Sequence, residues 1–287
     1  MIVCPMKVVL LLLCLMGLIA PHVRGVGILV NGTAIFNTGA PTVSDIANWD
    51  SGWGSMSVNG WNYVGQVQNA GGVYLGNGWV LTAGHVGEGD FYLDGNTYDA
   101  VPRTAQTITT SIGEADMTLF QIATNPNLPA LTIATSAPSA ADMFGSGGDQ
   151  VAMIGYGGSS KSWGLNTVTK NNLEVQVDGY SFLTVDFETA YGDPPSDFAN
   201  LDNDAVLIPG DSGGGDFIYD PLTSEWELAG INEAVDSNSD SYMVELGYYA
   251  TQINAITAVP EPDAWWLVLL GAVTIFTWGR RGGRSMK

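Results

Sequence analysis

Residues 71–85 read GGVYLGNGWVLTAGH, where short apolar runs alternate with glycine and asparagine and the last run ends in a small-residue turn at His85. Similar β-branched or aromatic runs recur between clusters of Gly, Asn, Asp and Ser: FYLDGNTYDAV, QTITTSI, MTLFQIA, QVAMIGYGG, LEVQVDG, SFLTVDF, GDFIYD and WELAGINEAV. Strands at such short spacing are typical of sandwiches and barrels. The pattern therefore predicts an all-β body, with one short helix within residues 242–256.

The body is expected to consist of two halves. A stretch rich in Pro, Ala, Ser and Gly, residues 125–149, interrupts the strand pattern and should join residues 26–135 to residues 136–258. Both cysteines lie in the first 14 residues, so the body has no disulfide. A body of this size still buries roughly 70% or more of the surface of its unfolded chain, which is enough for a stable core.

The first 25 residues have the features of a signal peptide. Lys7 precedes the apolar run Val8–Ala20, and a small residue, Gly25, follows shortly after. A charged start, an apolar run of this length and a small residue at its end are the features that signal peptidases recognise. We expect secretion across the inner membrane, with cleavage near Gly25.

The last segment, residues 259–287, has three parts: Val259-Pro260-Glu261-Pro262, the uncharged run 264–279, and the pair Arg280-Arg281. A helix over the run would span roughly 24 Å, which reaches across a bilayer when Trp and Arg lie at its interfaces. The three parts resemble the PEP-CTERM sorting signal of Gram-negative bacteria. This resemblance implies an exosortase-type partner and transient or permanent membrane attachment, and an ordinary single-pass anchor is the alternative.

The charge of the body excludes one class of function. Three basic residues, Arg103, Lys161 and Lys170, face twenty-seven acidic ones between residues 26 and 259, a net charge of −24. Such a surface repels phosphate backbones, so nucleic acids are not expected partners. His85 is the only histidine of the body, which excludes metal sites built from several histidines.

A nucleophile motif lies in Gly210-Asp211-Ser212-Gly213-Gly214, where small neighbours let a substrate approach the serine closely. The pattern G-x-S-x-G also occurs in α/β-hydrolases, but there the catalytic histidine follows the serine. No histidine follows Ser212, so only His85, ahead of it, can act as its base. Asp116 opens the apolar strand pattern Asp116–Ile122 and supplies a carboxylate between them in the chain.

From about Gly71 to Val235 the sequence resembles the trypsin/chymotrypsin family, whose signatures T-A-A-H-C, D-I-A-L-L and G-D-S-G-G-P occur in the same order. The resemblance implies two packed six-stranded antiparallel β-barrels. It also implies that His85 is the general base, that Asp116 orients it and that Ser212 is the nucleophile. The backbone N–H groups of Gly210 and Ser212 would then form the oxyanion hole.

The chain departs from the family pattern beside the catalytic histidine and at its N-terminus. Gly84 and Val86 replace the Ala and Cys of the family. In the family a freed N-terminal ammonium pairs with the Asp before the serine, here Asp211. The usual Ile-Val-Gly-Gly start is missing, so signal cleavage near Val26 or Ile28 is expected to supply the ammonium, unless another cation does.

The resemblance also places a substrate pocket. Val206 would lie at its base, and since no carboxylate stands there a trypsin-like preference for Lys or Arg is not expected. The wall would include Ile231 and Glu233, with Glu233 replacing the family's serine. We expect a small or medium apolar side chain in this pocket.

No cofactor or metal is expected. Asp236-Ser-Asn238-Ser-Asp240 opens like a calcium loop, but Ser241 and Gly247 stand where that motif needs Gly and Glu. We therefore interpret these acids as solvated turn residues.

The sequence as a whole predicts a secreted or surface-sorted bacterial serine endopeptidase that acts on proteins or peptides, in the periplasm, at the cell surface or outside the cell. Two alternatives remain: an esterase with the same triad, or a catalytically silent surface-binding or matrix protein on the same fold.

Overall fold

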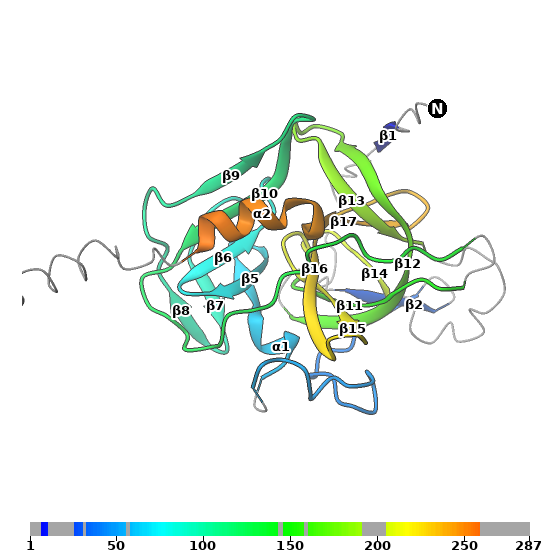
Figure 1. The fold of residues 1–287 in the computed structure, drawn as a ribbon, viewed down its shortest axis with the longest axis horizontal. Coiled ribbons are helices and arrows are strands. Elements are labelled where there is room, and N and C mark those ends of the chain that lie inside the picture. The colour runs from blue at the N-terminus through cyan, green and yellow to red at the C-terminus, as the bar shows by residue number, and fades with distance from the viewer. Residues whose placement is uncertain are drawn as a thin grey trace, which may run out of the picture.

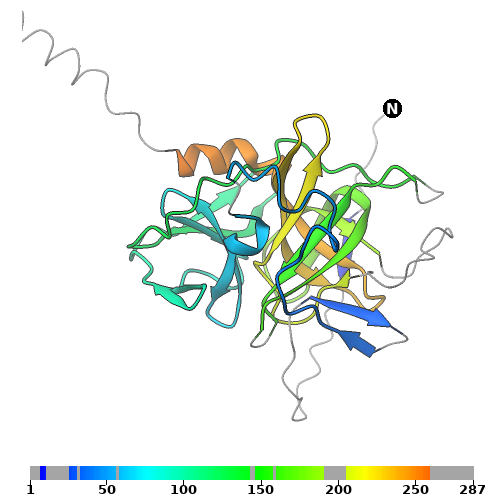
Figure 2. The same cartoon turned by 90° about the horizontal axis from the view of Figure 1, so that it is seen from below.

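The computed structural model describes residues 7–10, 26–30, 33–55, 58–142, 146–157, 160–190 and 205–258. Most of the predicted signal peptide and the whole predicted sorting segment lie outside these ranges. Within them, no helix combines the length and the apolar character needed to cross a membrane. The described chain is mostly β-structure, arranged in two large groups of strands beside one another (Figures 1 and 2), which confirms the predicted fold class.

The first group, which we call the N-terminal sheet, has seven antiparallel strands in the order β8-β7-β4-β5-β6-β10-β9. Their bounds are β4 Val64–Val67, β5 Ala70–Gly76, β6 Trp79–Thr82, β7 Phe91–Leu93, β8 Asn96–Tyr98, β9 Gln106–Thr109 and β10 Glu114–Gln121. The hairpin between β5 and β6 turns at Asn77 and Gly78, which have φ values of 53° and 81°. Asn and Gly are the residues that tolerate positive φ best, so the local sequence dictates this hairpin.

The second group, the C-terminal barrel, contains six antiparallel strands in the order β12-β11-β15-β16-β17-β13, and β13 pairs back with β12 to close it. The bounds are β11 Gln150–Gly155, β12 Ser162–Val177, β13 Thr184–Thr189, β15 Gly215–Asp220, β16 Glu225–Val235 and β17 Ser241–Glu245. A further strand, β1 Lys7–Leu10, runs parallel to the end of β12. The closed barrel has the six strands that the resemblance implies, whereas the N-terminal sheet has seven.

A small third sheet connects the start of the body to its second half. It has the order β14-β2-β3, with β2 Gly27–Val30, β3 Thr33–Ile35 and β14 Ala205–Val206. Since β14 lies just before the Ser212 turn, the first residues of the body lie beside the C-terminal barrel rather than beside the N-terminal sheet.

Two helices complete the described fold. The short α1, Gly60–Tyr63, is capped by Asn59, whose side chain accepts a hydrogen bond from the N–H of Trp61. The longer α2, Leu246–Thr257, buries Leu246, Tyr249, Ala250 and Ile253, which recur at helical spacing on one face. This face contacts both β16 and β9, so α2 bridges the two large groups of strands (Figure 1).

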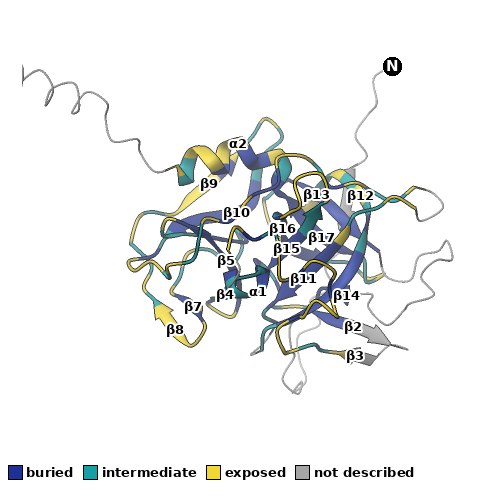
Figure 3. Ribbon diagram, turned by 60° about the horizontal axis from the view of Figure 1, so that its bottom comes forward, coloured by how far each residue is buried: buried dark blue, intermediate teal, exposed yellow. Residues whose placement is uncertain are grey.

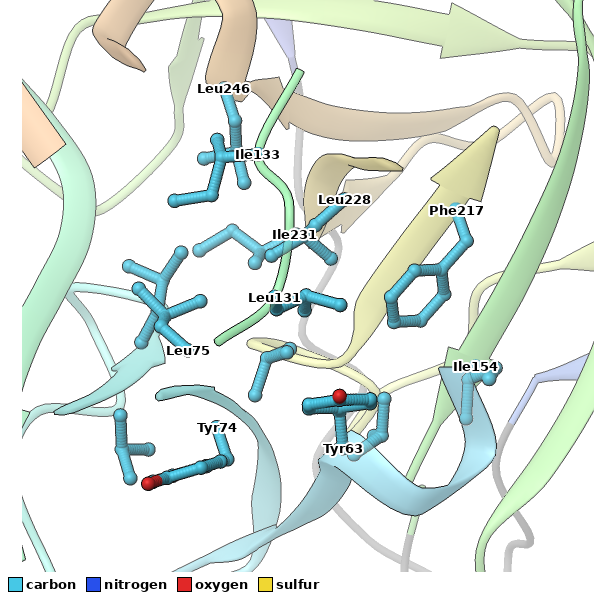
Figure 4. Packing of buried hydrophobic residues seen from close by; sticks show 14 of the residues in the cluster. Tyr63, Tyr74, Leu75, Leu131, Ile133, Ile154, Phe217, Leu228, Ile231 and Leu246 are labelled. Carbon is cyan, nitrogen blue, oxygen red and sulfur yellow. The ribbon is translucent and has the colours of Figure 1, made fainter. Parts of the chain in front are cut away.

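The two groups share one hydrophobic core (Figures 3 and 4). The connecting segment, residues 131–134, runs between them, with Leu131 and Ile133 pointing into the core (Figure 4). The N–H of Leu131 donates to the carbonyl of Leu75 in β5 at 3.0 Å. On its other side, the carbonyl of Thr132 accepts from the N–H of Leu228 in β16 at 2.9 Å. The segment is therefore bonded to a strand of each group.

Aromatic residues from the chain before β4 extend this core. Phe217 of β15 is fully buried, and its ring lies 5.3 Å from that of Trp53 and 6.3 Å from that of Trp49, edge to face in both cases. Trp53 in turn stacks on Trp226 at 5.4 Å. These contacts fasten residues 45–55 onto the C-terminal barrel.

Replacing Phe217 by Ala should lower the free energy of unfolding by about 3–5 kcal/mol, because a buried ring is lost and its neighbours cannot fill the space. Urea denaturation followed by tryptophan fluorescence measures this loss. Leu222→Ala serves as the control, since Leu222 is 93% exposed and its truncation should change stability by less than about 0.5 kcal/mol. Similar losses for the two variants would contradict the proposed core.

Candidate active site

His85 is held by both oxygens of a single carboxylate. The turn after β6 closes when the N–H groups of Val86 and Gly87 donate to the carbonyl of Ala83, each at 3.1 Å. The backbone N–H of His85 then donates to Oδ1 of Asp116 at 2.7 Å, and Nδ1 of its ring lies 2.6 Å from Oδ2. Because a carboxylate only accepts hydrogen bonds, Nδ1 carries the proton in the neutral ring. Nε2 is thereby left as the basic nitrogen.

The glycine before His85 is required by this contact. A Cβ at Gly84 would lie 2.8 Å from Oδ1 of Asp116 and 3.1 Å from the ring of Phe182. An alanine, which the family pattern has at this position, would therefore push the carboxylate away from His85. The local departure from the family pattern is explained by the close approach of β10.

Ser212 lies in a turn that is held by three backbone hydrogen bonds. The N–H groups of Asp211, Gly213 and Gly214 donate to the carbonyls of Ile208, Asn232 and Asp211 at 3.0, 2.8 and 2.9 Å. Gly210 and Gly213 have φ values of 102° and 78°, which favour glycine. The N–H groups of Gly210 and Ser212, the two predicted oxyanion-hole donors, take no part in these three turn bonds.

Asn232 holds this turn, and sequence reasoning missed it. Its buried Nδ2 donates to the carbonyls of Ile154 and Asp211, both at 3.1 Å, so it ties the Ser212 turn to β11. The sequence assigned the segment around Asn232 only to the wall of the predicted substrate pocket. Nothing in a single sequence marks an asparagine within an apolar strand as the residue that fastens a distant turn.

Gly71 brings the serine turn against the histidine turn. Its N–H donates to the carbonyl of Ser212 at 2.8 Å, and its carbonyl accepts from Oγ1 of Thr82 at 2.7 Å. Thr82 ends the strand that leads to His85. A Cβ at Gly213 would clash with Oγ1 of Thr82, so the serine turn needs its glycine at this position. Through Gly71 and Thr82, the turn that carries Ser212 is therefore tied to the strand that leads to His85.

An aromatic side chain from the C-terminal barrel lies beside the imidazole. The ring of Tyr180, in the turn between β12 and β13, is centred 5.0 Å from that of His85 and 6.2 Å from that of Phe182. Tyr180 is 42% exposed. It is therefore available to a bound substrate, and the sequence did not identify it because the resemblance places no motif in this turn.

The three residues predicted to form the substrate pocket are all buried. Val206 pairs with Gly27 in the small sheet. Ile231 belongs to the shared core. Glu233 is linked to Asp116 through Thr184. Oγ1 of Thr184 donates to Oε1 of Glu233 at 3.2 Å and accepts from the N–H of Asp116 at 3.0 Å.

Asp211, before the serine, binds the first described residue of the body. It is fully enclosed, and its carboxylate accepts the N–H groups of Ile208 at 2.8 Å, Gly157 at 2.9 Å and Val26. Burial outweighs these bonds and raises the pKa of Asp211 to about 7. Val26 is fully buried as well, and its carbonyl accepts from Oγ of Ser162 at 3.0 Å.

The structure assigns an ordinary role to the acids of the calcium-like motif. Oδ1 of Asp236 accepts the backbone N–H groups of Asn238 and Asp240 at 2.8 and 2.9 Å, which closes the turn between β16 and β17. Across the described ranges, no group of three or more His, Cys, Asp or Glu side chains is arranged to hold a metal ion.

Comparisons with known proteins show the family of the chain. The sequence profile of the family described as Trypsin matches residues 53–256, so the chain belongs to the trypsin family. No curated protein matches the chain at a significant level.

Among solved structures, the chain is similar to the inactive form of the Rv3671c protease of M. tuberculosis, with 18% identity over 69% of this chain and 90% of that one and a TM-score of 0.48. It is also similar to the NS6 protease of murine norovirus 1, with 14% identity, coverage of 64% and 90%, and a TM-score of 0.44. A third similarity is to the HtrA-type protease AlgW with a decapeptide, with 20% identity, coverage of 65% and 50%, and a TM-score of 0.43.

The buried acids predict how stability depends on pH. Burial raises the pKa of Asp186 to about 7 and the pKa values of Asp216 and Glu233 well above their ordinary range. Between about pH 4 and pH 7 the folded chain therefore holds protons that the unfolded chain has released, so stability falls as pH rises. The melting temperature should be higher at pH 5 than at pH 7.5 at equal ionic strength.

Asp186→Asn is the matched variant for this measurement. Its neutral amide cannot ionise, so the difference in melting temperature between the two pH values should shrink. A wild-type melting temperature that is equal or higher at pH 7.5 would contradict the protonation of these groups in the folded state.

Proposed function

We propose that the chain is a serine endopeptidase that uses His85, Asp116 and Ser212. The observation that carries this proposal is the pair of hydrogen bonds that Asp116 accepts from the backbone and the ring of His85. These bonds lie near the point where the Gly-Asp-Ser-Gly-Gly turn is bonded to the N-terminal sheet. A surface-binding protein would have no need for a buried carboxylate that fixes the tautomer of a partly exposed histidine.

The proposed reaction follows from these positions. Nε2 of His85 accepts the proton of the Ser212 hydroxyl as its oxygen attacks the peptide carbonyl. The negative Asp116 stabilises the imidazolium that forms, and the N–H groups of Gly210 and Ser212 bind the oxyanion. His85 then gives the proton to the leaving amine, and the same base activates water to release the acyl group from Ser212.

The location of the protein is a separate proposal that rests on the sequence. We propose that residues 1–25 direct secretion and that residues 259–287 direct sorting by an exosortase-type enzyme, with membrane attachment through residues 264–279. The position of Val26 supports processing near Gly25, because a new N-terminus at Val26 would place its ammonium against Asp211 in a pocket that already binds its N–H group.

The enzymatic proposal is tested with a fluorophosphonate probe, which modifies activated serines covalently. The wild-type protein should be labelled and should degrade casein, whereas Ser212→Ala should do neither. Ser237→Ala, at an exposed position in the turn between β16 and β17, is the control and should behave like the wild type.

Each other outcome of this experiment has a definite meaning. Labelling without proteolysis, together with hydrolysis of ester substrates, would replace the endopeptidase with an esterase. A folded protein that is not labelled would contradict both the endopeptidase and the esterase hypotheses. It would favour a catalytically silent surface protein.

The role of the N-terminus is tested with two forms of the protein, one beginning at Val26 and one with two extra residues before it. An ammonium at Val26 would pair with Asp211, and losing a buried ion pair costs about 3–5 kcal/mol. The extended form should therefore have kcat/KM values at least about tenfold lower. The same two residues added at the C-terminus should have no effect, and full activity of the extended form would remove the ammonium from the mechanism.

A further inference from the structure

Behind Asp116, on the side away from His85, lies a buried group of acids and a hydroxyl from the C-terminal barrel. Thr184 and Asp186 project from β13 and Glu233 from β16. Thr184 and Asp186 are fully buried and Glu233 is 5% exposed. Neither the proposed chemistry nor the sequence motifs account for Asp186, and Glu233 stands where the family pattern has a serine.

A chain of contacts leads from Asp116 into this group. The N–H of Asp116 donates to Oγ1 of Thr184, whose own proton goes to Oε1 of Glu233. Thr184 has one proton and is both acceptor and donor here, so its orientation is fixed by its two neighbours. Glu233 therefore acts on the backbone of Asp116 through one hydroxyl.

Glu233 also lies next to Asp186. The two carboxyl groups lie within hydrogen-bonding reach of each other. As ionised groups they would only accept, and then neither oxygen of Asp186 nor Oε2 of Glu233 would have a donor among the described residues. A hydrogen bond between them requires a proton on one of the two groups. Burial raises the pKa of both carboxyl groups and so favours that proton.

Among the residues that the structure describes, no basic side chain is recorded beside this pair. The titratable groups that face it are Asp116 on β10, Glu245 on β17 and Tyr249 on α2, all of them acidic or neutral. Tyr249 accepts the N–H of Val185 at 2.8 Å. The negative charge of this group can therefore be lowered only by protons, and burial accordingly raises the pKa of Glu233 well above its ordinary value and that of Asp186 to about 7.

Both lysines of the body have recorded partners outside this group. Nζ of Lys170 pairs with Glu188 at 2.7 Å. Nζ of Lys161 donates to the carbonyls of Trp61 and Val64 at 2.7 and 2.8 Å.

We propose that Glu233 is a positioning residue for the His85–Asp116 couple, and that the proton it shares with Asp186 controls the basicity of His85. This inference rests on the proposed function. With two protons the Glu233–Asp186 pair is neutral and with one it adds a negative charge behind Asp116. A second negative charge there stabilises the imidazolium of His85 and so makes Nε2 a stronger base.

Two variants separate the two parts of this proposal. Glu233→Gln keeps an oxygen for Thr184 and should retain kcat within about twofold, whereas Glu233→Met has similar volume and no acceptor, and should lower kcat by about tenfold with KM unchanged. The double variant Glu233→Gln/Asp186→Asn is isosteric and cannot ionise. It should lower the pKa of His85 by roughly half a unit and move the acid limb of kcat/KM to lower pH by the same amount.

The pKa of His85 is read directly by NMR of its imidazole nitrogens. The chain has two histidines, His22 and His85, and His85→Ala identifies the signal. Glu188→Gln is the control. Glu188 is a buried acid on β13, the strand of Asp186, and its partner is Lys170, so this variant should leave the His85 titration unchanged.

An unchanged His85 titration in the double variant would overturn the coupling, and a loss in Glu233→Gln as large as in Glu233→Met would overturn the positioning role. If Glu233→Met does not fold, the kcat of Glu233→Gln tests the positioning role and the His85 titration of the double variant tests the coupling. A wild type without Ser212-dependent turnover would remove the proposed function, and the NMR titration would then decide the coupling alone.

Discussion

The site depends on a single buried carboxylate. Asp116 uses Oδ1 for the backbone and Oδ2 for the ring of His85, so one side chain fixes the position, tilt and tautomer of the imidazole together. The surroundings serve this contact. Gly84 leaves room for it, β10 supplies it from the interior of the N-terminal sheet, and Thr184 reaches across from the C-terminal barrel to bind the backbone N–H of Asp116. The contact between Asp116 and His85 in one half is thus supported by a residue of the other half.

The sequence was sufficient for the fold class and for the family. Alternating apolar runs predict an antiparallel β-body because each strand has one buried face, and the fixed order of His85, Asp116 and Ser212 identifies the family to which the profile assigns residues 53–256. What the sequence could not supply are contacts between residues far apart in the chain. Asn232 and Tyr180 have ordinary local surroundings, and only the closed barrel brings them to the turns that they support or cover.

Glu233 illustrates this limit. Counting along the family pattern places it in the wall of the substrate pocket, because a motif alignment preserves position in the chain and says nothing of side-chain direction. In the structure it is buried and faces Asp116 through Thr184. A carboxyl in place of a serine needs a partner in the interior, and the chain provides Asp186, an acid rather than a base. The scarcity of basic residues in the body therefore extends to this buried group, where protons rather than basic side chains neutralise Glu233 and Asp186.

The connecting segment at residues 131–134 has a mechanical consequence. Because it is hydrogen-bonded to Leu75 on one side and to Leu228 on the other, and because its side chains fill the shared core, neither half can separate without breaking it from a strand. The proposed active site, which draws on both halves, is then rigid before any substrate binds. The same bonds make the two halves cooperative: they should lose their structure in one transition, although each has a sheet of its own.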